Sequence, residues 1–186
     1  MFTIRPEQPA HAVAIESLLD LTFGTDRRKK TSYRFRDGIA PLPELCFVAV
    51  AEAGALVGSV RYWPIVAGTT PALLLGPLAI EPARQGRGVG RALVFHSLDV
   101  AAQAGHRLVF LVGDPAYYER FGFDPVPRGI VMPGESSARL QYRLLDPTLA
   151  LPVPATLRRW FGHVPRSAEG TTPLAGKAIA AASGIP

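Results

Sequence analysis

The chain has 186 residues, of which 48% are hydrophobic and 19% charged, a composition that excludes an intrinsically disordered protein and suits one globular domain. No apolar run approaches the ~20 residues of a membrane-spanning helix, and the N-terminus lacks a basic-then-apolar signal, so we expect a cytoplasmic protein without membrane contact. The single cysteine excludes an intramolecular disulfide, and neither it nor the four histidines have ligand spacing, so we expect no metal.

The net charge of +5 raises the question of a nucleic-acid partner. The basic residues form no long block, however, and the chain has neither a helix-turn-helix pattern nor a platform of basic and aromatic residues. We therefore expect no nucleic acid. The densest basic run, Arg27–Lys30, is interpreted as a solvated loop or helix end.

Apolar patterning in the N-terminal part predicts five segments, four of them regular and one irregular. These are an edge strand at 2–5, a helix at 11–23, a short helix or loop at 25–43, and two strands of a hairpin at 45–51 and 55–66. Pro6 ends the edge strand, because proline cannot donate to a sheet ladder. Gly24 can close the helix, since glycine readily adopts the left-handed conformation that ends helices.

The most informative segment runs from Leu73 to Leu93. A nearly continuous apolar run at 73–80 predicts a strand covered on both faces. Three glycines and three arginines follow it, namely Gly86, Gly88, Gly90, Arg84, Arg87 and Arg91. A helix is predicted from about 88 to 104, and its buried face is Leu93, Val94, Leu98 and Ala101. Free amides at a helix start, the helix dipole and guanidinium groups all favour an anion, so we expect a phosphate or pyrophosphate here.

The spacing of the glycines excludes two common phosphate sites. A P-loop needs a lysine followed by Ser or Thr after its last glycine, and none is present. The dinucleotide fingerprint Gly-x-Gly-x-x-Gly fails in both frames, because its last position falls on Arg91 or Leu93. A plain turn is disfavoured because strand, loop and helix arrive in the order that a phosphate site needs.

Three further elements are predicted beyond this helix. They are a strand at 107–112, a short helix at 115–121 with Asp114 as candidate N-cap, and a strand at 139–145. The strands at 73–80 and 107–112 flank a helix, so they are expected to be parallel in a right-handed βαβ unit. Prolines interrupt the chain from Asp146, and five apolar residues are expected to be exposed: Leu151, Val153, Leu157, Trp160 and Phe161. We therefore divide the chain into a domain at 1–145 and a Pro-rich extension at 146–186, which either packs on the domain or is partly disordered.

Two motifs in this order resemble those of the GNAT acetyltransferases. The segment Gln85–Gly90 (QGRGVG) is similar to the Gln/Arg-x-x-Gly-x-Gly/Ala motif with which that family binds the pyrophosphate of acetyl-CoA. Tyr118–Phe123 (YERFGF) is similar to the Tyr-x-x-x-Gly-Phe end of a short helix in many members. The longer string Gly113–Phe123 (GDPAYYERFGF) resembles one bacterial subgroup. The resemblance covers roughly 2–145 and is weak before residue 45.

The resemblance implies an α/β (α+β) fold with one domain. A central mixed sheet of six to seven strands would have helices on both faces, and its two parallel strands would splay apart at the acetyl-CoA site. The implied activity is acetyl-CoA-dependent N-acetylation of a primary amine, on a small molecule or a protein, by direct attack on the thioester. The alternative is a non-catalytic module that binds acyl-CoA and regulates a partner, since both motifs serve either role. A homodimer is compatible with the resemblance, because family members are often dimers.

The resemblance also assigns roles to individual residues. Acetyl-CoA would contact Leu78, Ala79, Ile80, Gln85, Gly86, Arg87, Gly88, Val89, Gly90, Arg91 and Tyr117. A backbone amide near Leu78 or Ala79 is the expected oxyanion donor, freed where the strands splay. Tyr118 is the expected general acid for the departing thiolate, because a phenol with a pKa of about 10 is protonated at neutral pH.

No general base stands where many family members have one. Neither strand, 73–80 or 107–112, contains an acid, and Glu81 precedes Pro82 and is expected to point away from the acetyl group. The base is therefore water, Glu44, or no group at all if the amine arrives neutral. The acceptor itself would be set by 25–43, the strand near 62–66 and the extension, and the sequence does not choose it.

Overall fold

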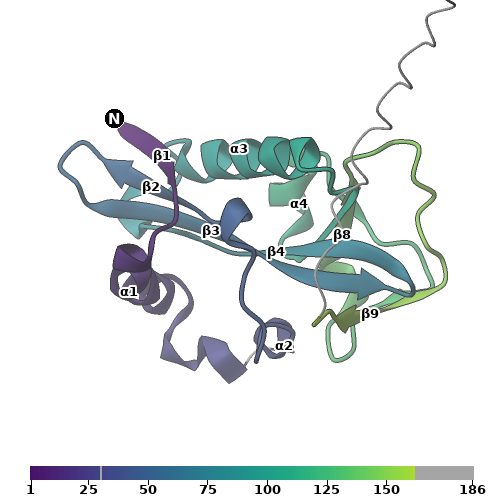
Figure 1. Cartoon of the computed structure of the whole chain (residues 1–186). Helices are drawn as coiled ribbons and strands as arrows, with labels where there is room; N and C mark the ends of the chain where they lie inside the picture. The colour runs from purple at the N-terminus through teal and green to yellow at the C-terminus, as the bar shows by residue number, and fades with distance from the viewer. Residues whose placement is uncertain (30, 162–186) are drawn as a thin grey trace, which may run out of the picture.

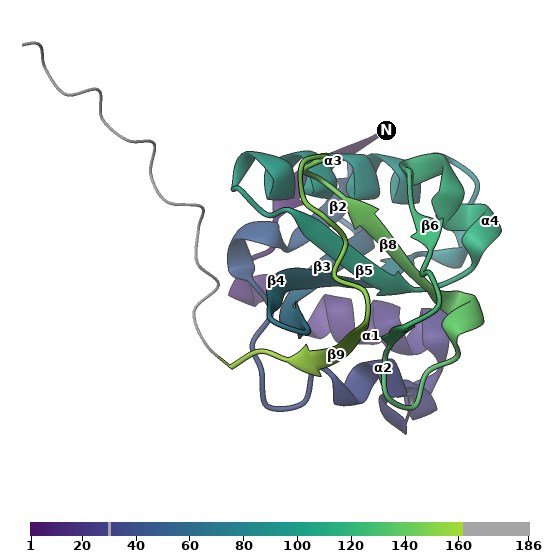
Figure 2. The same cartoon turned by 90° about the vertical axis from the view of Figure 1, so that its right-hand side faces the viewer.

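The computed structural model describes residues 1–29 and 31–161, which build one twisted sheet with helices on both faces (Figures 1 and 2). The strands are β1 (Phe2–Pro6), β2 (Phe47–Ala51), β3 (Leu56–Ala67), β4 (Thr70–Ile80), β5 (Leu108–Val112), β6 (Asp124–Pro125), β7 (Ile130–Val131), β8 (Leu140–Leu144) and β9 (Ala155–Arg159). The α-helices are α1 (Ala12–Phe23), α2 (Thr31–Arg34), α3 (Val89–Gln103) and α4 (Pro115–Tyr118). Short 3-10 helices are η1 (Pro9–His11), η2 (Thr25–Lys29), η3 (Pro43–Leu45), η4 (Pro82–Arg84), η5 (Glu119–Phe121) and η6 (Ser137–Arg139).

The sheet is mixed, as predicted. Its strand order is β1-β2-β3-β4-β5-β8-β6, and within this path β4 and β5 are the parallel neighbours. Strand β9 adds to the same sheet by pairing antiparallel with β3, and β7 pairs parallel with β9. The fold class expected from the sequence is confirmed, and the short strand β7 and the strand β9 are additions that no sequence pattern had indicated.

The two parallel strands part soon after they meet. β4 and β5 pair only at Leu73 with Val109 and at Leu74 with Phe110. Beyond this point β4 stays paired with β3, and β5 stays paired with β8. The facing edges of 75–80 and 111–112 therefore have no strand between them, and their backbone groups are available to a ligand. The predicted splay is confirmed.

Helices α3 and α1 cover opposite faces of the sheet (Figure 1). All four residues predicted for the inner face of α3 are at most 1% exposed. The helix lies close to β3, since a Cβ at Gly58 would be 2.9 Å from Cδ1 of Leu93. On the other face α1 buries Ile15, Leu18 and Leu19 against the sheet. Within residues 1–29 and 31–161, no helix combines the length and apolar character needed to cross a membrane.

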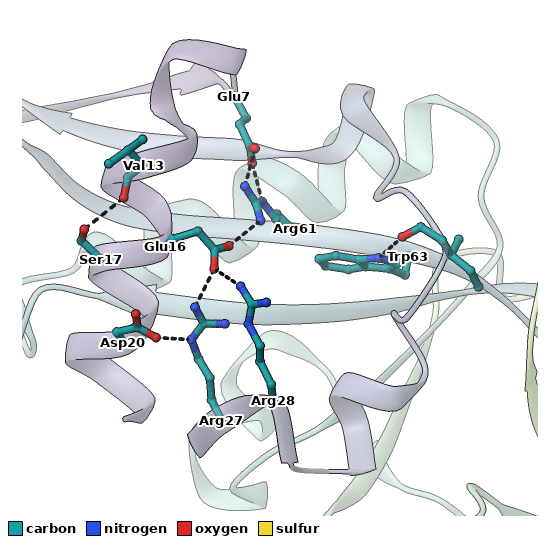
Figure 3. A network of polar contacts seen from close by, with 10 residues as sticks. Glu7, Val13, Glu16, Ser17, Asp20, Arg27, Arg28, Arg61 and Trp63 are labelled. Carbon is teal, nitrogen blue, oxygen red and sulfur yellow. Dashed lines mark hydrogen bonds and ion pairs between the residues drawn. The ribbon is translucent and has the colours of Figure 1, made fainter. Parts of the chain in front are cut away.

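Within the basic run at 27–29, the prediction of a solvated loop or helix end is wrong for Arg27 alone, since Arg28 and Lys29 are exposed. Arg27 is 3% exposed, and it donates hydrogen bonds to Glu16 at 2.6 Å and to Asp20 at 2.9 Å (Figure 3). Arg28 also bonds Glu16, at 3.0 Å. Burial raises the pKa of Glu16, but the bonds from both arginines outweigh it and hold that pKa below its usual value. A buried guanidinium needs carboxylate partners, and α1 supplies them, so η2 folds back onto α1. Lys30 lies outside the described residues.

Part of the Pro-rich extension belongs to the sheet. Leu157, expected to be exposed, is 0% exposed because β9 pairs with the end of β3 and turns this side chain into the core. Leu151 and Trp160 are partly buried, whereas Val153 and Phe161 are exposed, as expected. Residues 162–186 of the extension lie outside the part of the chain that the structure describes.

We expect Leu157→Ala to lower the free energy of unfolding by about 2–5 kcal/mol, because it leaves a cavity between β9 and the core. Phe161→Ala is the matched control, since Phe161 is 72% exposed and its truncation should change stability by no more than ~0.5 kcal/mol. Urea denaturation of both variants measures the difference. Equal stabilities would show that β9 contributes nothing to the folded domain.

Candidate active site

The loop between β4 and α3 leads into a helix N-terminus that has no side-chain cap among the described residues. Gly88 is the N-cap residue of α3, with φ of 83°, and Gly86 has φ of 72°. Only glycine adopts such angles without strain, so both residues are needed for the chain to turn sharply into the helix. No side chain bonds the first amides of α3, which are therefore open to a ligand.

A cavity of about 560 Å³ lies in front of this loop. It is lined by Leu78 and Ile80 of β4, by Gln85, Gly86, Gly88, Gly90 and Arg91 of the loop and α3, and by Tyr117 and Tyr118 of α4. Nine of the twelve residues that the sequence singled out therefore meet at one place. Thr22, Arg84 and Arg120 also line it; of these, the sequence had placed only Arg84 at the phosphate site, and none was among the expected acetyl-CoA contacts.

The side chains of three predicted contact residues do not line this cavity. Ala79 is fully buried toward α1, and Val89 is buried in the core beneath α3. Arg87 is exposed and does not line the cavity. The pleat of β4 explains why the Ala79 side chain lies away from the cavity. Consecutive side chains of a strand point to opposite faces, and those of Leu78 and Ile80 line the cavity.

The ladder between β3 and β4 decides which backbone groups face the splayed edge. The amide of Glu81 donates to the carbonyl of Val57 at 3.0 Å, so alternation directs the backbone groups of Ala79 toward β3 as well. Those of Leu78 and Ile80 point the other way. Consistently, Nε2 of Gln85 donates to the Ile80 carbonyl at 3.3 Å from outside the ladder. Of the two residues expected to hold an oxyanion donor, Leu78 has its amide at the open edge.

Tyr118 stands where the strands part. Asp114 is the N-cap of helix α4, as the sequence predicted, and its side chain accepts a hydrogen bond from the amide of Ala116 at 3.2 Å. The Tyr118 ring packs closely against Gly113, where an added Cβ would overlap Cε2 of the ring and lie 2.7 Å from Cδ2. Among the described residues its hydroxyl has no hydrogen-bond partner, and the side chain lines cavities on both sides.

The surroundings of Tyr118 keep its phenol protonated. Burial raises its pKa well above the usual value, and the neighbouring Tyr117 raises it further. Arg36 and Arg139 lower it, but by less than burial raises it. At neutral pH the side chain is therefore a hydrogen-bond donor.

Tyr117 closes over the start of α3. A Cβ at Gly90 would lie 2.6 Å from the Tyr117 hydroxyl, so the glycine makes room for the phenol. The Arg120 guanidinium lies 5.0 Å from the centre of the Tyr117 ring, within range of a cation–π contact. Tyr117 thus lies between the open helix end and Arg120, a position that suits the acetyl-CoA contact expected from the sequence.

A second cavity of about 520 Å³ opens on the other side of Leu78 and Tyr118. Charged side chains that sequence reasoning missed line it: Arg36, Glu135 and Arg139. Arg36 belongs to the 25–43 segment expected to set the acceptor, but no motif distinguishes it. Glu135 and Arg139 come from the connection between β7 and β8, far away in sequence. Glu44, a candidate base, lines neither cavity.

Comparison with known proteins identifies the family. Residues 12–123 match the family model described as Acetyltransferase (GNAT) family. The chain belongs to the GNAT acetyltransferases. It is 34% identical over 152 residues to the N-acetyltransferase YhbS of Escherichia coli K12, an alignment that covers 78% of this chain and 89% of YhbS. The chain is thus an N-acetyltransferase of the GNAT type, as the sequence predicted.

Solved structures of the family share the fold. The crystal structure of Escherichia coli YhbS in complex with CoA has a TM-score of 0.73 and 28% identity, covering 86% of this chain and 89% of that one. A GNAT acetyltransferase from Brucella melitensis in complex with acetyl-CoA has a TM-score of 0.66 and 25% identity, covering 87% and 97%. Both similarities extend over nearly the whole of each relative.

The close approach of Tyr118 to Gly113 is testable by a double-mutant cycle. Gly113→Ala should cost about 1–3 kcal/mol of unfolding free energy, because the new methyl group overlaps the ring. In a Tyr118→Ala background the same change should be nearly neutral, since the obstructing ring is gone. Denaturation of the four proteins gives the coupling energy, and additive effects would contradict the contact.

Proposed function

We propose that the chain transfers the acetyl group of acetyl-CoA to a primary amine, with Tyr118 as the general acid. The observation that carries this proposal is the position of Leu78 and Tyr118, which are shared by both cavities at the split between β4 and β5. If the thioester of acetyl-CoA is bound at this point, the rest of the coenzyme occupies the first cavity and an amine can approach from the second. Attack could then occur directly, without an acyl-enzyme intermediate.

The first cavity suits the coenzyme. The open amides at the start of α3 and the guanidinium groups of Arg84, Arg91 and Arg120 offer hydrogen bonds and positive charge to a pyrophosphate. The free edge at Leu78 and Ile80 would hold the pantetheine, whose amides pair readily with strand backbone. The CoA and acetyl-CoA complexes of the two relatives support this assignment.

Each step then has a group in place. The amine lone pair attacks the thioester carbonyl carbon, and the Leu78 amide donates to the oxygen that becomes negative. Collapse of the tetrahedral intermediate breaks the carbon–sulfur bond, and Tyr118 donates its proton to the departing thiolate. An acceptor that arrives as an ammonium ion releases one proton to solvent before it attacks, and the nitrogen releases a second proton to solvent after the carbon–nitrogen bond has formed. Glu44 has no place in this scheme because it lies outside both cavities.

The regulatory alternative is not favoured. A protein that only held acyl-CoA would need the first cavity alone. Here a second cavity with charged side chains opens directly onto Tyr118, whose hydroxyl has no partner among the described residues. The membership of the chain in the family, together with a relative named as an N-acetyltransferase, supports turnover.

Tyr118→Phe should lower kcat by roughly 10²–10⁴-fold, the usual contribution of general acid catalysis, and leave the Kd for acetyl-CoA unchanged. The ring and its packing are retained, so stability should not change. Tyr142→Phe is the control, because Tyr142 is partly buried and lines neither cavity. Thiol release measures turnover, and full activity of Tyr118→Phe would remove this residue as the acid.

Gly88→Val should weaken acetyl-CoA binding at least tenfold, because a side chain at the N-cap blocks the open amides. Gly54→Val is a matched control: Gly54 has φ of 84°, close to the 83° of Gly88, with nothing within 4 Å, but lies in the β2–β3 turn. Both variants carry the same backbone strain, ~1–2 kcal/mol. Titration calorimetry separates them, and Gly→Ala at both positions replaces the pair if valine prevents folding. Equal affinities would contradict the phosphate assignment.

A further inference from the structure

We infer that the acceptor amine also carries a carboxylate: it is an amino acid or a small molecule of the same zwitterionic type, with its carboxylate on Arg36 and its ammonium group facing Glu135. This inference rests on the proposed acetyl transfer and names the acceptor of the same site. It depends on the charges of the second cavity, which the transfer chemistry alone does not explain.

Arg36 is a sheltered charge without a counter-charge. Its Nε is inaccessible to solvent and has no hydrogen-bond partner, and no carboxylate of the described residues lies within 4 Å of the guanidinium. The Cζ atom of Arg36 lies over two aromatic rings, 4.7 Å from the ring centre of Tyr33 and 5.1 Å from that of Trp63. Burial lowers the pKa of Arg36 to about 10, so the group stays positively charged at neutral pH.

The other well-buried arginines of this face are satisfied within the protein. Arg27 holds Glu16 and Asp20, and Arg61 holds Glu7 through two bonds of 2.6 and 2.7 Å (Figure 3). Removing a guanidinium from water costs several kcal/mol unless an anion compensates it. Among the described residues, Arg27 and Arg61 have such anions, whereas Arg36, which is partly buried and has an enclosed Nε, has none. An anionic group of a ligand would fill the gap.

The position of Arg36 relates that anion to the chemistry. Its Nη2 is 3.2 Å from the point where a Cβ at Gly76 would stand, so the guanidinium reaches β4 just beyond its last pairing with β5. It is close enough to Tyr118 to lower the pKa of the phenol. A carboxylate on Arg36 would therefore hold the remainder of a small acceptor beside the thioester.

Glu135 supplies the opposite charge in the same cavity. Its Oε1 accepts a hydrogen bond from the amide of Ser32 at 2.9 Å, which fixes the carboxylate. It forms no ion pair with Arg36, although the two groups are near enough to influence each other. Two arginines, Arg36 and Arg139, and two carboxylates, Glu135 and Asp114, line this cavity of about 520 Å³, so its charges match a ligand that carries both signs. That volume lies within the range of small-molecule sites.

The first test needs only the wild-type protein. Thiol release is measured for amino acids and for the amines that differ from them by loss of the carboxylate, such as phenylalanine with phenethylamine. A bidentate bond to a charged group is worth ~1.5–3 kcal/mol, so kcat/KM should be about 10- to 150-fold higher for the amino acid. Equal or better use of the amines overturns the inference. Acetylation of O-phosphoethanolamine but of no amino acid overturns the carboxylate assignment.

The second test assigns the effect to Arg36. Arg36→Gln should raise the KM for the amino acid at least tenfold and leave the Kd for acetyl-CoA unchanged, with a much smaller effect on the kcat/KM for the matched amine. Arg34→Gln is the control, because Arg34 is exposed on the neighbouring helix and lines a different cavity. A loss of activity toward both acceptors alike would indicate a structural role for Arg36 and overturn the assignment.

The two proposals fail in different ways. If acetyl-CoA does not bind, or if no amine of any class releases thiol, the acetyl transfer proposed above is wrong. If acetyl-CoA binds and amines without a carboxylate are acetylated as fast as amino acids, the transfer stands and the zwitterionic acceptor is excluded. Glu135→Gln gives an independent reading, since it should raise the KM for the amino acid without altering the Kd for acetyl-CoA.

Discussion

The separation of β4 and β5 after Leu74 and Phe110 is the constraint on which the site depends. A parallel pair that stayed in register would use the backbone of 75–80 for its own ladder and leave nothing for a ligand. Each strand keeps its antiparallel neighbour on the other side, so the sheet remains continuous while one internal edge stays open. Both cavities form at this edge, and Leu78 and Tyr118 belong to both.

Ion pairs on the α1 face support one wall of the second cavity. Glu16 of α1 receives Arg27 and Arg28 of η2, and its other oxygen lies 3.8 Å from Arg61 of β3, so the first helix, the sheet and the following segment are joined (Figure 3). Exposed ion pairs contribute little to stability, but Arg27 is buried and would be costly without its partners. The chain that leaves η2 carries Arg36 toward β4. A structural cluster of paired charges thereby positions Arg36, which has no carboxylate partner among the described residues.

Sequence reasoning succeeded where the signal was local. The glycines of the loop, the buried face of α3 and the capping role of Asp114 each depend on residues a few positions apart, and the structure has all of them as expected. It failed where pairing joined distant segments. Leu157 sits among prolines, and only its strand pairing with Ala67 shows that it is core. The residues around Arg27 have the composition of a solvated basic run. The carboxylates that bind its buried guanidinium belong to the preceding helix, so the run itself does not indicate that Arg27 is buried.

Arg36 and Glu135 illustrate the same limit at the site itself. No spacing rule connects two residues that lie on separate connections and meet only because both connections cross the open edge of the sheet. Locally, Arg36 has no carboxylate partner among the described residues, and Glu135 accepts a bond from a backbone amide without a cation partner among them. Folded proteins are stable by only ~5–15 kcal/mol, so unsatisfied charges are retained where a ligand completes them. The cavity beside Tyr118 combines two such charges with a free phenol, which is the arrangement that a reactive acceptor site requires.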